Sequence, residues 1–170
     1  MLDLKWYVAS NLQDYNEESD LLYEGLYGYL YFQVNNHEIG LFFPERAFIQ
    51  KIEEGVAEDS GTTDIFAFFH YLKEKTLAQN FDNRPADFYF WDDLIKLRFL
   101  AKGDYIYITN FSVDIRRNTE RLLWEERILL SEWVKSISTA IGEFANNIIS
   151  ENPNLAKNKS LAELLCNLSP

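Results

Sequence analysis

Residues 26–34 alternate strictly between two kinds of side chain, and this pattern constrains the fold more than any other. One side carries Leu26, Gly28, Leu30, Phe32 and Val34, and the other carries Tyr27, Tyr29, Tyr31 and Gln33. A period of two is typical of a β-strand with one buried face. The tyrosine face can stay half wet, because each ring covers the sheet while its hydroxyl reaches water. Asn35-Asn36 suits a turn and Pro44 ends the next apolar run, so we predict a hairpin of residues 26–34 and 39–43.

The remaining patterns predict more strands and two main helices. Strands are expected over residues 2–9, 88–91, 94–101, 105–109 and 111–116, with a β-bulge near Asn110 where the alternation changes phase. Apolar spacings of three and four predict a helix over 64–79, capped by Thr62 or Thr63, and a long one from about 130 to Asn152-Pro153. Residues 121–130 fit either a strand or the start of that helix, and Ser160 is expected to cap a short last helix over 161–168.

This order of elements predicts an α+β fold. We expect an antiparallel sheet of about six strands, with helices packed on one face and a long C-terminal helix. The 170 residues suit one domain, 1–170, in which 153–170 form a C-terminal helical extension.

The charge is distributed very unevenly along the chain. Residues 1–64 hold 13 Asp and Glu but 3 Lys and Arg, a net charge of −10, whereas residues 65–170 hold 14 and 13, a net charge of −1. Such asymmetry concerns partners rather than fold, and it indicates a surface that attracts a basic protein. An acidic chain repels phosphates, so nucleic acid is not an expected partner.

Location and redox chemistry follow from what the sequence lacks. Cys166 is the one cysteine, so no intramolecular disulfide can form. The first residues do not resemble a secretory signal, and no apolar run is long enough to span a membrane. We therefore expect a cytoplasmic protein without a membrane partner.

No residue pattern predicts catalysis, a cofactor or a metal. His37 falls in the predicted turn and His70 on the first helix, and neither has a partner motif that would make it a general base. Nothing around Cys166 matches a cysteine-enzyme signature, and no cysteine or histidine pair has zinc spacing. The acids at 53–59 lack the alternating ligands of a calcium loop. The expectation is a protein that is not an enzyme.

What remains is a candidate surface for protein binding, in two acidic patches. The first patch is Asp14, Glu17, Glu18, Asp20 and Glu24, and the second is Glu53, Glu54, Glu58 and Asp59. We favour the second, because a loop between packed elements presents charge with less ordering than a long mobile connection. The one positive cluster consists of Arg116, Arg117, Arg121 and Arg127, and it could pair with the acidic part, within the fold or between subunits.

The layout resembles that of bacterial immunity proteins of polymorphic toxin systems. The similarity rests on the short acidic α+β chain, the segment Glu24 to Asn36, the phenylalanine-rich helix and the late helix that begins Ser131-Glu-Trp-Val-Lys. It implies an inhibitor that neutralises a basic toxin, often a nuclease, by binding it. The alternative is a structural or housekeeping protein that self-associates as a homodimer through its aromatic sheet face, and an enzyme of unrecognised type comes third.

Overall fold

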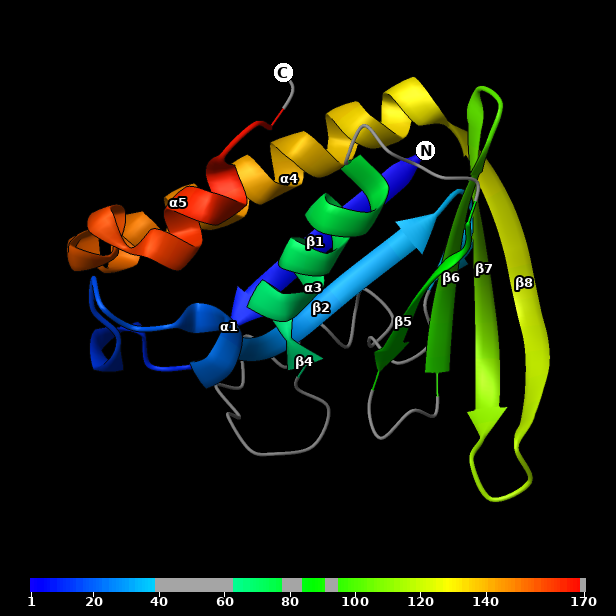
Figure 1. Ribbon diagram of the computed structural model, residues 1–170, viewed down its shortest axis with the longest axis horizontal. Coiled ribbons are helices and arrows are strands. Elements are labelled where there is room, and N and C mark those ends of the chain that lie inside the picture. The colour runs from blue at the N-terminus through cyan, green and yellow to red at the C-terminus, as the bar shows by residue number, and fades with distance from the viewer. Residues whose placement is uncertain (39–62, 78–83, 91–94, 169–170) are drawn as a thin grey trace.

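Two antiparallel sheets and the helices between and beside them make up the computed structural model, which describes residues 1–38, 63–77, 84–90 and 95–168. Within those residues each sheet has four strands (Figure 1). The first sheet contains β1 (Leu2–Val8), β2 (Tyr27–Val34), β3 (His37–Glu38) and β4 (Thr63–Asp64). The second contains β5 (Ala86–Phe90), β6 (Ile95–Lys102), β7 (Tyr105–Asp114) and β8 (Thr119–Leu129). The predicted α+β class is confirmed, but the prediction of a single sheet of about six strands is wrong.

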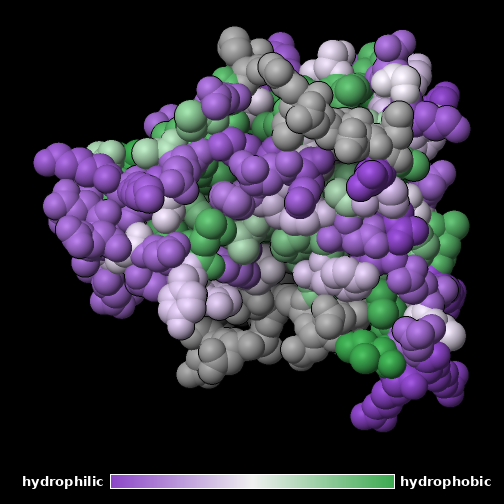
Figure 2. All heavy atoms as spheres, in the orientation of Figure 1, coloured by the Kyte–Doolittle hydropathy of each residue, from purple (hydrophilic) through white to green (hydrophobic). Residues whose placement is uncertain are grey.

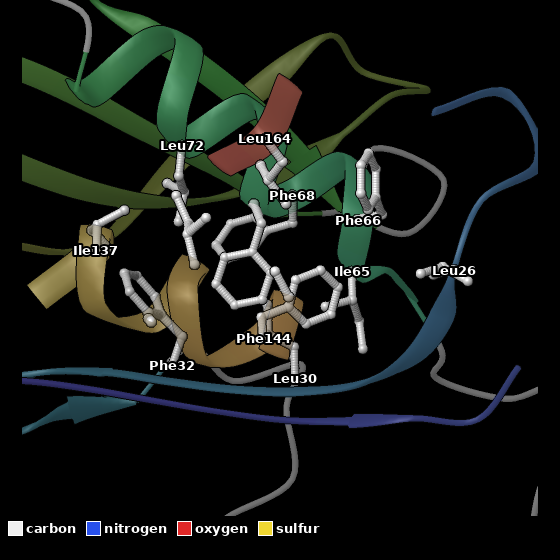
Figure 3. Close-up of a cluster of buried hydrophobic side chains, with 14 of the residues drawn as sticks. Leu26, Leu30, Phe32, Ile65, Phe66, Phe68, Leu72, Ile137, Phe144 and Leu164 are labelled. Atoms are coloured by element: carbon white, nitrogen blue, oxygen red, sulfur yellow. The ribbon is translucent and has the colours of Figure 1, made fainter. Parts of the chain in front are cut away.

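Helix α3 (Ile65–Leu72) explains why two sheets are needed. Its Phe68 ring lies 6.1 Å from Phe32 of β2 and 5.2 Å from Phe88 of β5, so one side chain contacts both sheets. Its Phe69 ring lies 5.3 Å from Trp6 of β1. The helix buries Ile65, Phe66, Phe68, Phe69 and Leu72 (Figure 3). A single buried stripe was expected, but a helix that is apolar on most sides requires cover from more than one direction.

Helix α4 (Leu130–Glu151) is the long helix that the sequence predicts. Its Trp133 is fully buried, with ring centroids 6.3 Å from Phe32 and 5.5 Å from Phe99 of β6. The Trp133 indole donates a hydrogen bond to the Thr76 hydroxyl, which in turn donates to the carbonyl of Leu72. Thr76 lies in the π-helical turn η2 (Lys73–Leu77) that continues α3. Trp133 therefore joins both sheets and α3 to α4.

The C-terminal segment packs into the same core. It contains the 3-10 turn η3 (Pro153–Lys157) and helix α5 (Lys159–Leu165). Leu155, Leu161 and Leu164 are buried in the cluster that also includes Leu12, the single buried residue of the 3-10 turn η1 (Leu12–Asp14). Residues 152–164 thus lie against the residues between β1 and β2 (Figure 1).

The predicted hairpin begins as expected. Leu30, Phe32 and Val34 of β2 are fully buried, and β2 turns into β3 at Asn35, whose φ is 55°. The predicted return strand, 39–43, lies outside the described residues. The tyrosine face differs from the expectation, because Tyr29 and Tyr31 are each 2% exposed.

The predicted β-bulge is present, but in the neighbouring strand. β7 pairs with β6 without interruption and turns Asn110 towards the core, whereas β8 carries the extra residue, Leu123. The change of alternation near Asn110 therefore reflects a buried amide in a regular strand. Residues 121–129, which fitted a strand or a helix, belong to β8, and α4 begins at Leu130.

Candidate protein-binding surface

The first acidic patch lies on a segment that other parts of the chain hold in place. This segment, residues 11–24, is called the acidic connection below. The side-chain amide of Asn152 donates to the carbonyls of Leu12 and Tyr15 at 2.7 and 3.0 Å. The amide of Asn158 donates to the carbonyls of Asn16 and Ser19 at 2.9 and 2.8 Å. The connection was expected to be long and mobile, but its backbone is bound at four carbonyls.

The same two asparagines also cap helices. Asn152 Oδ1 accepts from the backbone N–H of Asn154 at the start of η3, and Asn158 Oδ1 accepts from Leu161 at the start of α5. Each side chain is almost wholly buried and uses both ends of its amide. Asn158 is therefore the cap of the last helix, where Ser160 was expected, and the Ser160 hydroxyl instead accepts from the N–H of Leu21.

Helix α1 (Leu21–Glu24) forms the end of the acidic connection, and nearby groups make hydrogen bonds to the backbone at both of its ends. Asp20 Oδ1 accepts from the N–H of Leu22, and Glu24 accepts from the N–H of Asp20 at 2.9 Å. The Tyr15 hydroxyl donates to the carbonyl of Gly25, which follows the helix with a φ of 76°. These bonds fix the backbone from which the acidic side chains project.

All five carboxylates of the first patch are exposed. They belong to Asp14, Glu17, Glu18, Asp20 and Glu24. Within the described part of the chain, none of them lies in an ion pair. The patch therefore has no direct ion-pair partner among those residues.

Apolar side chains are exposed among these acids. Tyr23 is 90% exposed and Leu22 41% exposed, both on α1. We call the whole set the α1 surface: Asp14, Glu17, Glu18, Asp20, Leu22, Tyr23 and Glu24. In Figure 2 the side of the molecule that carries α1 and α5 is mostly hydrophilic. A large exposed ring close in the sequence to several carboxylates can serve as an aromatic anchor within a polar surface.

A shallow hollow lies between the acidic connection and the C-terminal segment. Its volume is about 540 Å³, and its lining includes Glu17, Glu18 and Asp20 on one side and Lys157, Lys159 and Glu163 on the other. Lys159 Nζ lies 3.8 Å from Glu163, its i+4 neighbour. The hollow is therefore predominantly acidic.

The second acidic patch, Glu53, Glu54, Glu58 and Asp59, lies outside the described residues. The preference for it rested on the supposed mobility of the acidic connection. Since the backbone of that connection is bound at four carbonyls, the reason for ranking the first patch lower no longer holds.

His37 has partners that the sequence did not indicate. Its Nε2 lies 3.3 Å from Glu126 of β8, and its ring stacks on Trp124 with centroids 5.6 Å apart. Glu126 also accepts from the side-chain amide of Asn35 at 2.7 Å. These contacts tie the β2–β3 turn to the inner face of β8. No signal in the sequence links residues about 90 positions apart, so pattern reasoning could not find them.

A second charged cluster lies on the outer face of the second sheet. Lys96 is almost completely buried between the carboxylates of Asp87 and Glu120, with its ammonium 4.6 Å from the Phe111 ring centroid. Arg98 binds Asp87 through both carboxylate oxygens, at 2.7 and 2.8 Å. This bidentate pairing holds the pKa of Asp87 below its usual value. The cluster fixes strand pairing and has the features of a structural ion network.

Within one chain, the described residues show no ion pair between the arginine cluster and the acidic part. Arg117 instead lies 3.6 Å from Asp114, and the Arg127 guanidinium lies 4.7 Å from the Tyr105 ring centroid. In the same part of the chain, no three histidine, cysteine or acidic side chains gather as metal ligands would.

Among the described residues, no helix has both the length and the apolar character that crossing a membrane requires.

Comparison with known proteins found no relative of this chain. No family model, curated protein or solved structure matches the chain.

Proposed function

We propose that this protein is a non-enzymatic inhibitor of the immunity type, which binds a basic toxin through the α1 surface. One observation carries the proposal. Five exposed carboxylates without an ion pair among the described residues stand on a backbone that Asn152 and Asn158 hold in place.

The charge of the α1 surface suits recognition of a basic protein. Like charges held close together repel one another, and an approaching cationic surface relieves that repulsion. A concentrated field also steers a basic partner and raises the association rate. Because the backbone is already ordered, binding costs less conformational entropy than it would for a loose segment.

The exposed ring of Tyr23 supplies an anchor for the short-range part of such an interface. Tyrosine buries a large area at a small entropic cost, and binding energy tends to concentrate in aromatic residues near the centre of an interface. Tyr23 lies between Asp20 and Glu24 along the chain, and it is 90% exposed in the unbound protein. The carboxylates around it would then form the polar rim.

A nuclease is a chemically suitable target. A nuclease site that binds phosphates is basic, so an acidic surface can occupy it in place of the nucleic acid. Steric and electrostatic blockade requires no catalytic residue in the inhibitor.

The alternative of self-association through the tyrosine face of β2 has less support. Tyr29 and Tyr31 are buried in the described structure and are not available on the surface. Tyr27, which is 48% exposed, is the one tyrosine of that strand that remains accessible.

The proposal is tested first by inspection of the neighbouring genes and then by binding measurements with purified protein. A gene for a large secreted toxin is expected directly upstream of the one for this chain. The toxin domain would be titrated with the wild-type protein and with a five-amide variant: Asp14→Asn, Glu17→Gln, Glu18→Gln, Asp20→Asn and Glu24→Gln. Amides of equal size keep the local hydrogen bonds of Asp20 and Glu24, so the variant removes charge with little change in shape.

A matched distal variant controls for net charge. It converts five other exposed acids to amides: Asp104, Asp114, Glu125, Glu132 and Glu143. We expect the five-amide variant to weaken binding by about a hundredfold, or roughly 3 kcal/mol, and the distal variant to change it little. Equal affinities for the two variants would contradict the assignment of the α1 surface, and absence of a toxin gene would contradict the immunity role.

A further inference from the structure

Strand β8 presents a long edge. It is the last strand of the second sheet, in the order β5-β6-β7-β8, and it runs for 11 residues. In the described part of the chain, no strand pairs with the side of β8 that faces away from β7 (Figure 1). The backbone N–H and C=O groups along such an edge are a template for another strand.

Apolar side chains accompany this edge. Leu122 is 56% exposed, Leu123 44% and Leu129 40%. In Figure 2 hydrophobic atoms appear among hydrophilic ones along the margin where β8 lies. These leucines would leave water if another strand packed beside them.

The β-bulge decides which residues share a face of β8. Before the bulge, Glu120 and Leu122 lie opposite Val113 and Phe111 of β7, on the outer face of the sheet. Beyond it, the outer face carries the odd-numbered residues Glu125, Arg127 and Leu129, and the inner face carries Trp124, Glu126 and Ile128. The bulge thus exchanges odd-numbered and even-numbered residues between the two faces halfway along the strand.

This change of parity permits an antiparallel pairing of β8 with β8 of a second copy. A two-fold axis perpendicular to the sheet keeps each side chain on its own face, so residues that face each other must share that face. Before the bulge the outer face carries even-numbered residues, and beyond it the outer face carries odd-numbered ones. A residue before the bulge therefore shares a face with a residue beyond it when their two numbers add to an odd sum.

Charge selects one register among these. When Glu120 faces Arg127 of the second copy, Arg121 faces Glu126, so four opposite-charge pairs form across the axis. A shift of two residues in one direction places Glu120 opposite Glu125, and a shift in the other places it opposite Leu129. Lys96 already binds Glu120, and the Tyr105 ring lies against Arg127, so both charges are positioned in the single chain.

We propose that two copies of this chain form a dimer by antiparallel pairing of β8 with β8, in the register that sets Glu120 against Arg127. The occupant of the edge is a second copy because the strand is complementary to itself. This contact is independent of the proposed function, since β8 and α1 lie at opposite ends of the molecule (Figure 1). A dimer of this kind leaves both α1 surfaces accessible.

The mass in solution gives the first test. The chain has a mass of 20.0 kDa, so light scattering and sedimentation equilibrium should give about 40 kDa at high protein concentration and low salt. Arg127→Glu sets like charges against each other twice across the axis, and we expect the dimer Kd to rise about tenfold or more. Glu120→Gln added to it removes the repulsion, keeps an oxygen that can accept from the buried Lys96, and should lower the Kd again by severalfold. The control Arg116→Glu, in the exposed β7–β8 turn, should leave the Kd within about twofold.

Cross-linking tests the register even if a charge variant folds poorly. In a Cys166→Ser background, the pair Leu122→Cys and Glu125→Cys should give a disulfide-linked dimer, because these positions face each other in the proposed register. The pair Leu122→Cys and Leu129→Cys should not. A wild-type protein that stays monomeric at every concentration, or that cross-links equally in both pairs, would overturn the proposal. The charges and the bulge would then only protect the edge from pairing.

Discussion

Two asparagine side chains hold the candidate site together at the scale of single residues. Asn152 and Asn158 each cap a helix through Oδ1 and bind two carbonyls of the acidic connection through Nδ2. Their partners lie about 140 positions earlier in the sequence, where no local pattern could indicate them. The sequence predicts the acids of the surface but not the residues that hold it.

Replacement of Asn158 tests this role. Asn158→Ala removes a helix cap and leaves the carbonyls of Asn16 and Ser19 without their donor, so the free energy of unfolding should fall by about 2–4 kcal/mol. Urea denaturation measures the change. Asn147→Ala on the exposed side of α4 is the matched control and should cost less than about 0.5 kcal/mol. A loss as small as the control's for Asn158→Ala would show that the connection is not held by this contact.

The Asp87–Arg98 pair predicts a pH dependence at the same scale. The pKa of Asp87 is lower in the folded protein than in the unfolded chain, where a carboxyl of this kind titrates near ~3.9. The ion pair therefore stabilises the fold above about pH 4, and its contribution is lost as the pH falls through the folded pKa. Asp87→Asn should lower the free energy of unfolding by about 1 kcal/mol at neutral pH, because the pair is bidentate but partly exposed.

Stability measured between pH 2 and 7 separates this contribution from others. Wild type and Asp87→Asn should converge at the acid end. Asp114→Asn, which alters a more exposed pair with Arg117, should follow the wild-type curve within about 0.5 kcal/mol. A constant difference between wild type and Asp87→Asn at all pH values would mean that Asp87 acts through packing rather than charge.

At the scale of elements, the periodic stretches could be predicted and the arrangement of the sheets could not. Alternation located β2, β6 and β7, and apolar spacing located α3 and α4. Alternation says which side of a strand is buried but not which element buries it. The clue to a second sheet was the helix with Phe66, Phe68 and Phe69, since three rings on three sides require cover from several directions. The change of alternation in β7 predicted a bulge there, but it reflects the buried amide of Asn110, and the bulge lies in β8.

Truncation of β2 tests the assignment of its core face. Leu30→Ala and Phe32→Ala should each lower the free energy of unfolding by about 2–5 kcal/mol, because both side chains are fully buried. Ile115→Ala, at a side chain that is 55% exposed, is the control and should cost less than about 0.5 kcal/mol. Denaturant titration of the three variants gives the comparison. Similar small losses at all three positions would show that the core face of β2 is wrongly placed.

At the scale of the whole molecule, the exposed carboxylates and the ion-pair network lie in different regions. The α1 surface concentrates carboxylates beside α5, and the second sheet carries a network of ion pairs around the buried Lys96. The asymmetry of charge was visible in the sequence, but a negative charge alone does not distinguish a binding surface from one that only maintains solubility. The fixed backbone beneath the carboxylates favours binding.

A non-enzymatic role makes a prediction for the histidines. His70→Ala and His37→Ala should each leave toxin neutralisation intact, because a blockade mechanism transfers no proton. The measurement is survival of cells that express the toxin, with folding confirmed by circular dichroism. Loss of protection by folded His70→Ala would contradict the non-enzymatic proposal.

The association rate with the basic partner is the most direct test of the central claim, that the α1 surface is an electrostatic docking surface. Stopped-flow mixing of the toxin domain with wild type and with the five-amide variant would be done across ionic strength. At low salt we expect wild type to associate at least about tenfold faster. The two rates should approach each other as the Debye length shortens from about 8 Å at physiological salt to about 3 Å at 1 M. Equal rates at low salt, with both proteins folded, would contradict the claim.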